Sequence, residues 1–484
     1  MNVKQTLLQT SIAALCCWAS VGQAQSLLKE WDTPFADPLR TRPTTLKTGT
    51  VLPGDSLSLQ DVCPMNSALP EMTSLSLAEA VDLALCRNPQ IKSAWAAIKV
   101  QAAALGEARA AFLPTVSVGL GRLNDRTTYP HTQYPDTFLQ SDTSNAGMNW
   151  RLFDFGDRTA NQRSAQAILN AALANHDAVL QKTLAGVISA YFDVQTAKAN
   201  WESRQKNEIL SEHILETAQR REARNVGAQT DTLQAMTALA KARLDRGRAS
   251  GALRKAHSVL IYALGLPAST ELRFNEDVQD TNHDMQRALH DWLDEAELQH
   301  PAIKAARAQL LAAEEKVNAT RAEGRPTIDF AANYYRNGRP NQGLSANSTH
   351  ETMIGVTVTI PIFDGFTHTY KLRGAQAQVE QKQAELEDAE HQILMEIVKT
   401  YADATAALDN LEASQLLLSS AENALSSVQR KFDKGVVDIL DILNAQAALL
   451  DAQQERIRCM AEWRSARLLL LANSGVLGRE SFRK

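Results

Sequence analysis

The chain has 484 residues, of which 44% are hydrophobic and 22% are charged, and its formal net charge is −5 at pH 7. A chain of this length can bury a large core and would ordinarily form about three domains. The modest negative charge argues against nucleic acid as a partner.

Residues 1–24 have the pattern of a secretory signal peptide. Lys4 precedes an apolar stretch that runs from Leu7 to Trp18, and Gly22-Gln23-Ala24 provides a cleavage site of small residues. The apolar stretch is too short and too often interrupted by polar residues for a membrane anchor. Residues 25–75 are expected to be an extended periplasmic segment, because they are rich in Pro, Thr and Ser without a clear period.

Three cysteines remain after removal of the signal peptide. In the oxidising periplasm, Cys63 and Cys86 are close enough in sequence to form a disulfide that ties the N-terminal segment to the first helix. Two free, buried thiols are the alternative. Cys459 lies in a helical run and is expected in the core.

The first half of the mature chain, residues 76–265, is expected to contain a strand pair and a very long helix. Ser76 and Glu79 have the capping-box spacing at the start of the first helix. Met148, Trp150 and Leu152 alternate with polar residues, which is typical of a strand with one apolar face. The predicted elements are strands at about 115–122 and 145–153, a polar loop over Leu123–Ser144, and a helix over 157–226.

Residues 286–475 repeat this arrangement after a connecting segment over 266–285. Ile354, Val356 and Val358 again alternate with glycine and threonine, and a polar run without proline follows. That run predicts a helix of roughly 100 Å. The predicted elements are strands at about 327–335 and 353–361, a helix over 367–434, and a tail over 476–484.

Several landmarks recur at a nearly constant offset, which indicates an internal duplication. The offset is 212 residues for the proline-starting helices (300 − 88), 210 for the Phe-Asp motifs (363 − 153) and 208 for the two glycines (435 − 227). The recurring landmarks are Asn88-Pro89 with His300-Pro301, Pro114 with Pro326, Phe153-Asp154 with Phe363-Asp364, and Gly227 with Gly435.

Four strands of about nine residues can cross a bilayer, but they cannot close a barrel, since the smallest barrels have about eight strands. Open strand edges are too costly in lipid. We therefore expect the chain to share a barrel with copies of itself. Two copies would give eight strands and three would give twelve, and the pattern does not choose between them. The long helices are too polar to cross lipid and are expected to stand in water as coiled coils.

The doubled pattern, the motifs Leu152-Phe153-Asp154-Phe155-Gly156 and Ile362-Phe363-Asp364-Gly365, and the two glycines together resemble the TolC family of outer-membrane channel-tunnels. The resemblance covers nearly all of the chain after residue 75. The N-terminal pattern, with Cys63-Pro64 and then Leu85-Cys86-Arg87-Asn88-Pro89-Gln90, is most similar to the type I secretion branch, which includes the channel that exports adenylate cyclase toxin.

The resemblance implies a mainly α-helical protein with a membrane β-barrel. Four strands from each chain of a homotrimer would form a shared twelve-stranded barrel in the outer membrane of a Gram-negative bacterium, and the long helices would form an α-helical barrel in the periplasm. The implied partners are a periplasmic membrane-fusion adaptor, an inner-membrane ABC exporter and outer-membrane lipid.

The candidate site residues lie where the long helices end. Gly227 and Gly435 are expected to terminate these helices in the left-handed conformation, which costs glycine least. Together with Val226 and Val436, they form the tips at which the adaptor and the exporter are expected to dock.

Asp438, Asp441 and Asn444 follow Gly435 at three-residue spacing and therefore share one helix face. The resemblance implies that Asp441 narrows the periplasmic entrance, while Asn444 takes the position of a second aspartate. Asp231 is the weaker counterpart in the first half, since it follows its glycine by four residues rather than six. The alternative role for these acids is to stabilise helix N-termini through the helix dipole.

The resemblance also implies a latch that holds the entrance closed, formed by an aromatic residue and an arginine. The aromatic position holds Phe432, but the arginine position holds Val437. The sequence therefore predicts an entrance looser than in relatives.

The leading hypothesis is a passive exit duct for a protein substrate, such as an RTX-type toxin, in a type I secretion system. The alternatives are the outer-membrane channel of a drug or metal efflux pump and a periplasmic coiled-coil adaptor without a pore. The adaptor hypothesis leaves the four strands unexplained. The sequence has no phosphate-binding loop, dinucleotide fingerprint, nucleophile elbow or zinc-ligand spacing, so it predicts no enzyme, cofactor or metal site.

Overall fold

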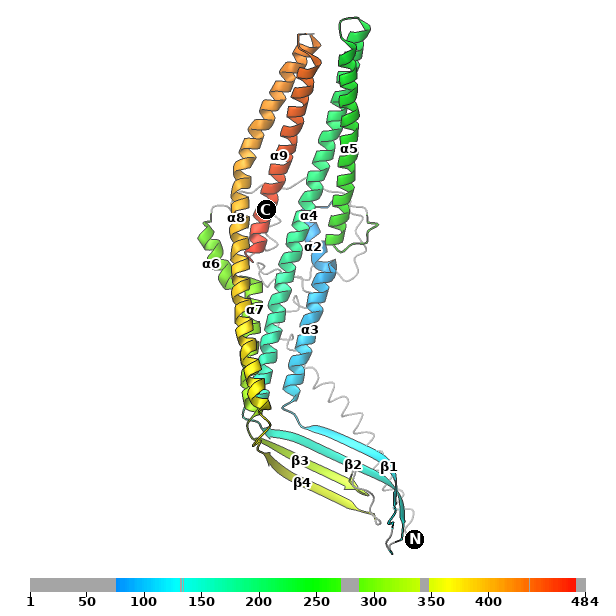
Figure 1. Ribbon diagram of the computed structural model, residues 1–484, viewed down its shortest axis with the longest axis vertical. Coiled ribbons are helices and arrows are strands. Elements are labelled where there is room, and N and C mark those ends of the chain that lie inside the picture. The colour runs from blue at the N-terminus through cyan, green and yellow to red at the C-terminus, as the bar shows by residue number, and fades with distance from the viewer. Residues whose placement is uncertain are drawn as a thin grey trace. The chain divides into compact units, whose positions relative to one another are not determined.

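The computed structural model describes most of the chain, and Figure 1 shows its elements. The expected signal peptide and extended segment up to residue 74, Gly435 and the tail over 476–484 lie outside the described residues, as does most of the connecting segment. The described residues are 75–130, 133, 135–270, 287–339, 348–434 and 436–475.

The described residues fall into two compact units. We call the first the sheet unit, which contains Ile98–Ala172 and Ala306–Leu386. We call the second the hairpin unit, which contains the described parts of Arg42–Ala97, Leu173–Ala305 and Glu387–Lys484.

The two halves of the chain contain the same elements in the same order, which confirms the predicted duplication. The long helices α4 and α8 each have 67 residues, and the return helices α5 and α9 each have 35. The first half consists of α2 (Leu77–Arg87), α3 (Pro89–Ala110), β1 (Thr115–Thr127), β2 (Thr137–Phe153), α4 (Asp157–Ala223) and α5 (Gln229–Ala263); the second consists of α6 (Leu289–Gln299), α7 (Pro301–Glu323), β3 (Thr327–Arg336), β4 (His350–Thr359), α8 (Thr367–Asp433) and α9 (Ile439–Asn473).

The four strands form one antiparallel sheet in the order β1-β2-β3-β4. Successive side chains of a strand point to opposite faces of the sheet. In these strands the apolar residues gather on one face, which is largely exposed, and most polar residues lie on the other. Val118, for example, is 71% exposed and Ile354 is also 71% exposed. The register places these residues on the apolar face: Val116, Val118, Leu120, Ala146, Met148, Trp150, Phe330, Ala332, Tyr334, Ile354, Val356 and Val358.

Strands β1 and β2 extend well into the stretch Leu123–Ser144 that was predicted to be a loop. β1 has 13 residues and β2 has 17, and their pairing continues out to Thr127 opposite Thr137. Polar side chains occupy both faces of this outer part, so the apolar alternation that identifies a strand in sequence is missing. The backbone ladder holds it together with a few polar contacts, such as the Arg122–Asp142 ion pair (3.8 Å) and the hydrogen bond that Thr143 Oγ1 donates to the Gly121 carbonyl (3.2 Å).

Aspartates of the two Phe-Asp motifs begin the long helices. The Asp154 carboxylate accepts hydrogen bonds from the backbone N–H groups of Gly156 (3.1 Å) and Arg158 (3.2 Å), and from the Arg158 guanidinium at 2.5 Å. In the second half the Asp364 carboxylate accepts from the His368 N–H at 2.7 Å. These bonds satisfy N–H groups that a helix start leaves unpaired.

The short helices α2 and α3 are also capped by side chains. Ser76 and Glu79 form the predicted capping box at α2. The Asn88 side chain accepts from the Gln90 N–H at 2.8 Å and donates to the Ala263 carbonyl at 2.9 Å, which joins α3 to the end of α5. His300 takes the corresponding place in the second half, where its Nδ1 accepts from the Ala302 N–H at 3.2 Å.

The main core of the hairpin unit packs around the middle of α4. Leu184, Ile188 and Tyr191 are fully buried there, next to Trp292 of α6 and Leu470 of α9. Among the described helices, none combines the length and the apolarity that a membrane crossing requires.

Candidate functional site

The hairpin unit ends in two tips, one between α4 and α5 and one between α8 and α9 (Figure 1). In each tip, a backbone N–H group donates a hydrogen bond to the carbonyl five residues earlier, at the end of the long helix. The Val226 N–H donates to the Arg221 carbonyl at 3.0 Å, and the Val436 N–H donates to the Lys431 carbonyl at 2.9 Å. This five-residue return is typical of a Schellman-type helix end. The two tips therefore correspond at an offset of 210 (436 − 226), and not at 208.

The left-handed residue of the first tip is Asn225, with φ of 57°, and not Gly227. Asparagine tolerates this conformation better than other non-glycine residues. Gly227 is needed for a different reason, because a Cβ there would lie 3.0 Å from the Arg221 Cβ. At the corrected offset, Gly435 corresponds to Asn225 and Val437 to Gly227, although Gly435 itself lies outside the described residues.

The corrected offset makes Asp231 and Asp441 equivalent (441 − 231 = 210), so the weaker correspondence expected for Asp231 was wrong. Each is the third residue of its helix, α5 or α9. Asp441 is exposed and Asp231 is half-buried. Asn444 is exposed one turn further along α9.

Asp438 precedes α9 as its N-cap residue, yet its side chain makes no capping hydrogen bond. The α5 helix begins after Ala228, which has no capping side chain. Within the described residues, the carboxylates of Asp231, Asp438 and Asp441 form no side-chain hydrogen bond or ion pair. No described basic side chain therefore neutralises these carboxylates.

An apolar cluster, which we call the tip cluster, joins the two hairpins just behind the tips. It is centred on Phe432, which is 2% exposed. The Arg221 guanidinium lies over the Phe432 ring, 5.0 Å from its centroid, and its Nη1 donates to the Phe432 carbonyl at 3.4 Å. The cluster consists of Ile214 and Ala218 of α4, Ala235 of α5, Phe432 of α8, and Ile439 and Ile442 of α9.

Sequence reasoning missed Arg221, and the expected latch stays a prediction. The arginine was sought five residues after Phe432, where Val437 packs against the tip cluster instead. Arg221 comes from the other half of the chain, 211 residues away. The sequence signal was an aromatic residue among the charged residues at the end of α8, and it did not identify the partner.

A seam of uncharged polar side chains joins α4 and α9 further from the tips. The Gln446 amide is 6% exposed and donates to Asn207 Oδ1 at 2.8 Å and to Ser211 Oγ at 2.7 Å. Ser203 Oγ donates to Gln453 Oε1 at 2.7 Å. Buried amides of this kind fix the register of packed helices.

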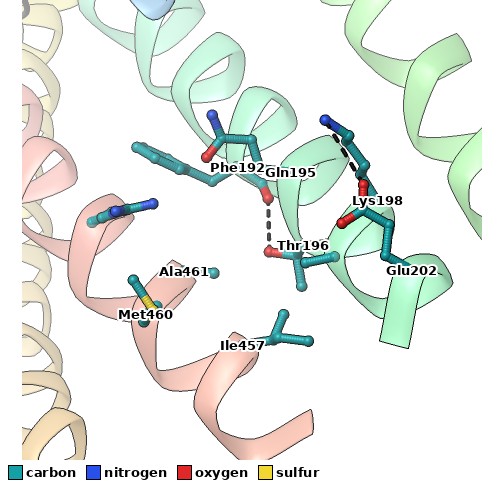
Figure 2. Close-up of a pocket in the computed structure, with 10 residues that line it drawn as sticks. Phe192, Gln195, Thr196, Lys198, Glu202, Ile457, Met460 and Ala461 are labelled. Carbon is teal, nitrogen blue, oxygen red and sulfur yellow. Dashed lines mark hydrogen bonds and ion pairs between the residues drawn. The ribbon is translucent and has the colours of Figure 1, made fainter. Parts of the chain in front are cut away.

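Next along the same two helices is a groove of about 310 Å³. Figure 2 shows Phe192 on the α4 side and Ile457 and Met460 on the α9 side, with the Lys198–Glu202 ion pair (3.9 Å) at its border. Gln195, Thr196 and Arg464 add polar groups to a lining that is otherwise apolar.

Cys86 is disulfide-bonded. Cys63 lies outside the described residues, so the Cys63–Cys86 pairing stays a prediction. Cys459 is a buried free thiol, as expected for a core residue. In the part of the chain that the structure describes, no three His, Cys, Asp or Glu side chains are placed to hold a metal ion.

Comparisons with known proteins place this architecture in one family. The family described as "Outer membrane efflux protein" matches residues 80–266 and 292–476, one stretch in each half. Protein CyaE of Bordetella pertussis is 34% identical over 410 residues, which cover 85% of this chain and 86% of CyaE. The alkaline protease secretion protein AprF of Pseudomonas aeruginosa is 26% identical over 419 residues, covering 84% of this chain and 85% of AprF.

Solved structures show the same fold at low identity. The outer membrane channel CmeC of Campylobacter jejuni has a TM-score of 0.75 at 15% identity, covering 88% of this chain and 92% of CmeC. The outer membrane protein VceC of Vibrio cholerae has a TM-score of 0.72 at 20% identity, covering 82% of this chain and 96% of VceC. The predicted fold class and outer-membrane location are thereby confirmed. The chain belongs to the outer membrane efflux protein family, to which the TolC channels also belong.

Proposed function

We propose that the chain is the outer-membrane exit duct of a type I secretion system. It passively conducts a protein substrate, such as an RTX-type toxin, from an inner-membrane ABC exporter and a periplasmic adaptor to the outside. The observation that carries this proposal is the similarity to AprF over 84% of the chain, since AprF is named for secretion of a protease. Deletion of the gene, followed by comparison of the proteins in the culture medium, tests it: at least one large protein should disappear and return on complementation.

Efflux of small molecules is the second candidate. It is favoured by similarity to the cobalt-zinc-cadmium resistance protein CzcC of Cupriavidus metallidurans, which is 23% identical over 66% of this chain. If the chain is an efflux channel, the deletion strain should become sensitive to drugs or metals, and its secreted proteins should stay the same.

The protein is proposed to act as a trimer. The four-stranded sheet exposes an apolar face, and among the described strands one side of β1 and one side of β4 have no partner. Unpaired strand edges are too costly in lipid, and three copies supply twelve strands, enough for a closed barrel. Native mass measurement of detergent-extracted protein should show three copies, and a stable folded monomer would contradict the proposal.

Asp231 and Asp441 are proposed to line the periplasmic entrance, with Asp438 and Asn444 beside them. Three copies would bring six unpaired carboxylates together around one axis. Carboxylates crowded between low-dielectric walls attract cations strongly. The pore should therefore be cation-selective and be blocked by multivalent cations from the periplasmic side.

Single-channel recording in a planar bilayer tests the entrance. Asp441→Ala should weaken the block, and addition of Asp231→Ala should weaken it further. Asp451→Ala removes an exposed aspartate from the same helix, away from the tip, and is the matched control. If all three variants keep the wild-type block, the aspartates do not line the constriction.

The tips are proposed to bind the adaptor and the exporter. Val226 and Val436 occupy equivalent positions and are 66% and 70% exposed, so each tip presents an apolar side chain to solvent. Gly227 directly follows Val226 and Gly435 directly precedes Val436 in the sequence, so both glycines belong to the proposed docking tips. A partner that covers these valines gains their burial, which contributes about 1.5 kcal/mol or more for each side chain.

A further inference from the structure

The polar face of the sheet has an arrangement of glycines and asparagines that the entrance and the tips do not explain. Along β1, Gly119 and Gly121 lie on this face, and they pair directly with Asn145 and Thr143 of β2. Gly147 of β2 pairs with Asn333 of β3 in the same way. In each pair a residue without a side chain lies opposite one whose side chain ends in an amide or hydroxyl group.

The polar side chains occupy the space that the glycines leave empty. A Cβ placed on Gly119 would lie 2.5 Å from Asn145 Oδ1, and one on Gly147 would lie 2.7 Å from Asn333 Oδ1. Side chains on a strand ordinarily stand roughly perpendicular to the sheet. Here Asn145 and Asn333 lie along the sheet, each over the neighbouring glycine, and therefore protrude less from the polar face.

The row that contains Gly147 and Asn333 carries no charge, and neither does the row before it, while Gly119 and Asn145 lie in the next row, where Glu351 is paired with Arg339. Two complete rows of four paired residues lie between the row that contains Arg151 and Asp329 and the row that contains Glu351. None of the residues in these two described rows is acidic or basic. The rows are Thr115, Asn149, Ala331 and Gly355, and Ser117, Gly147, Asn333 and Met353.

We propose that Gly119 and Gly147 are positioning residues of the pore wall, which hold the side chains of Asn145 and Asn333 against the sheet so that they do not obstruct the passage of an unfolded polypeptide along a wall without unpaired charge. The proposal rests on the proposed function, in which the polar face lines the barrel. An unfolded chain carries both acidic and basic side chains. A charged wall would attract the side chains of opposite charge and slow their passage. Amide groups exchange hydrogen bonds with peptide groups and water without holding either charge.

Substitution of the two glycines by alanine tests the proposal. Gly119→Ala/Gly147→Ala forces both asparagines off the sheet, because a Cβ cannot lie within 3 Å of their oxygens. Gly355→Ala is the matched control on the same face, since a Cβ there meets nothing within 4 Å. The rate at which cells export the cargo identified by the gene deletion should fall several-fold in the double variant and stay at the wild-type level in the control.

Removal of the displaced side chains should reverse the defect. Asn145→Ala/Asn333→Ala in the double-glycine background should restore export. If the glycine variant does not assemble in the outer membrane, Asn145→Gln/Asn333→Gln keeps both glycines but lengthens each side chain past its glycine, and it should also slow export.

A second readout separates this proposal from the proposed function. A cryo-electron microscopy map of Gly119→Ala/Gly147→Ala trimers should show both asparagines rotated into the lumen, whether or not the wild-type protein exports a polypeptide. Asparagines that stay against the sheet would overturn the proposal. Wild-type export by a variant with rotated asparagines would also overturn it, and would leave the exit-duct function intact.

Discussion

The contact between Arg221 and Phe432 gives the sharpest prediction about the entrance. Phe432 is 2% exposed and lies in the tip cluster that joins the α4–α5 hairpin to the α8–α9 hairpin. Phe432→Ala removes a buried aromatic ring and should cost about 3–5 kcal/mol. The stacked Arg221 guanidinium adds about 0.5–2 kcal/mol, so Arg221→Leu should have a smaller effect of the same kind.

These energies determine the expected change in the pore. If the tip cluster holds the two hairpins together at the entrance, a loss of roughly 3 kcal/mol favours separated tips by about a hundredfold, since 1.4 kcal/mol is a factor of ten. Single channels of Phe432→Ala should therefore show a larger conductance and longer open times than the wild type. Arg221→Leu should show an intermediate change. The double variant should differ little from Phe432→Ala, because the guanidinium has lost its ring.

A matched control separates the tips from general stability. Ile397 of α8 is also fully buried, but it packs in the main core of the hairpin unit. Ile397→Ala should lower Tm by a similar amount, since such a change costs about 2–5 kcal/mol, and should leave conductance unchanged. Equal conductance in Phe432→Ala and Ile397→Ala would refute the reasoning and reduce the tip cluster to ordinary core packing.

Three further predictions concern other parts of the chain. Burial, together with the charge of Lys304, lowers the pKa of His300 from 6.5 to about 4. Because the unfolded chain then binds a proton that the native chain does not, the free energy of unfolding should fall by at most about 3 kcal/mol as the pH drops from 6.5 to 4. His300→Asn, which places the residue of position 88 there, should flatten this dependence in denaturant titrations across that range. Gly227→Trp should leave barrel assembly intact but stop secretion, because a side chain there meets Arg221 and blocks docking at the tip; normal secretion would show that the partners bind elsewhere. Non-reducing peptide mapping should find Cys63 joined to Cys86, and free thiols at both positions would contradict the predicted disulfide.

Most of the architecture could be predicted because it depends on local patterns. Apolar alternation identified the strands at 145–153 and 353–361, the recurring prolines Pro114 and Pro326 placed the other two, and the absence of proline and of apolar runs identified the helices α4 and α8. The outer part of the β1–β2 hairpin was missed because polar residues such as Asn124 and Gln140 pair there without the apolar alternation that identifies a strand. No side-chain pattern reports such a pairing.

The tips were predicted in outline but aligned incorrectly. Matching one glycine with another gave the offset of 208, whereas the helix-ending bonds of Val226 and Val436 correspond at 210. The error arose because Asn225 adopts the left-handed conformation that was assigned to Gly227. The Arg221–Phe432 contact could not be predicted, since it depends on how the two hairpins pack and not on the sequence of either one.

The polar seam between α4 and α9 has a consequence for how the protein folds. Each hairpin forms from neighbouring sequence, but the seam joins residues 235 to 250 positions apart, as in Gln446 with Ser211 and Ser203 with Gln453. Contacts between such distant residues carry a large loop-closure cost and form late. Until these contacts form, the polar seam and the apolar surface beside it can pair with the matching helices of other newly exported chains. We therefore expect assembly to depend on periplasmic chaperones that keep the hairpins apart, and to fail by exchange of hairpins between copies when export outpaces them.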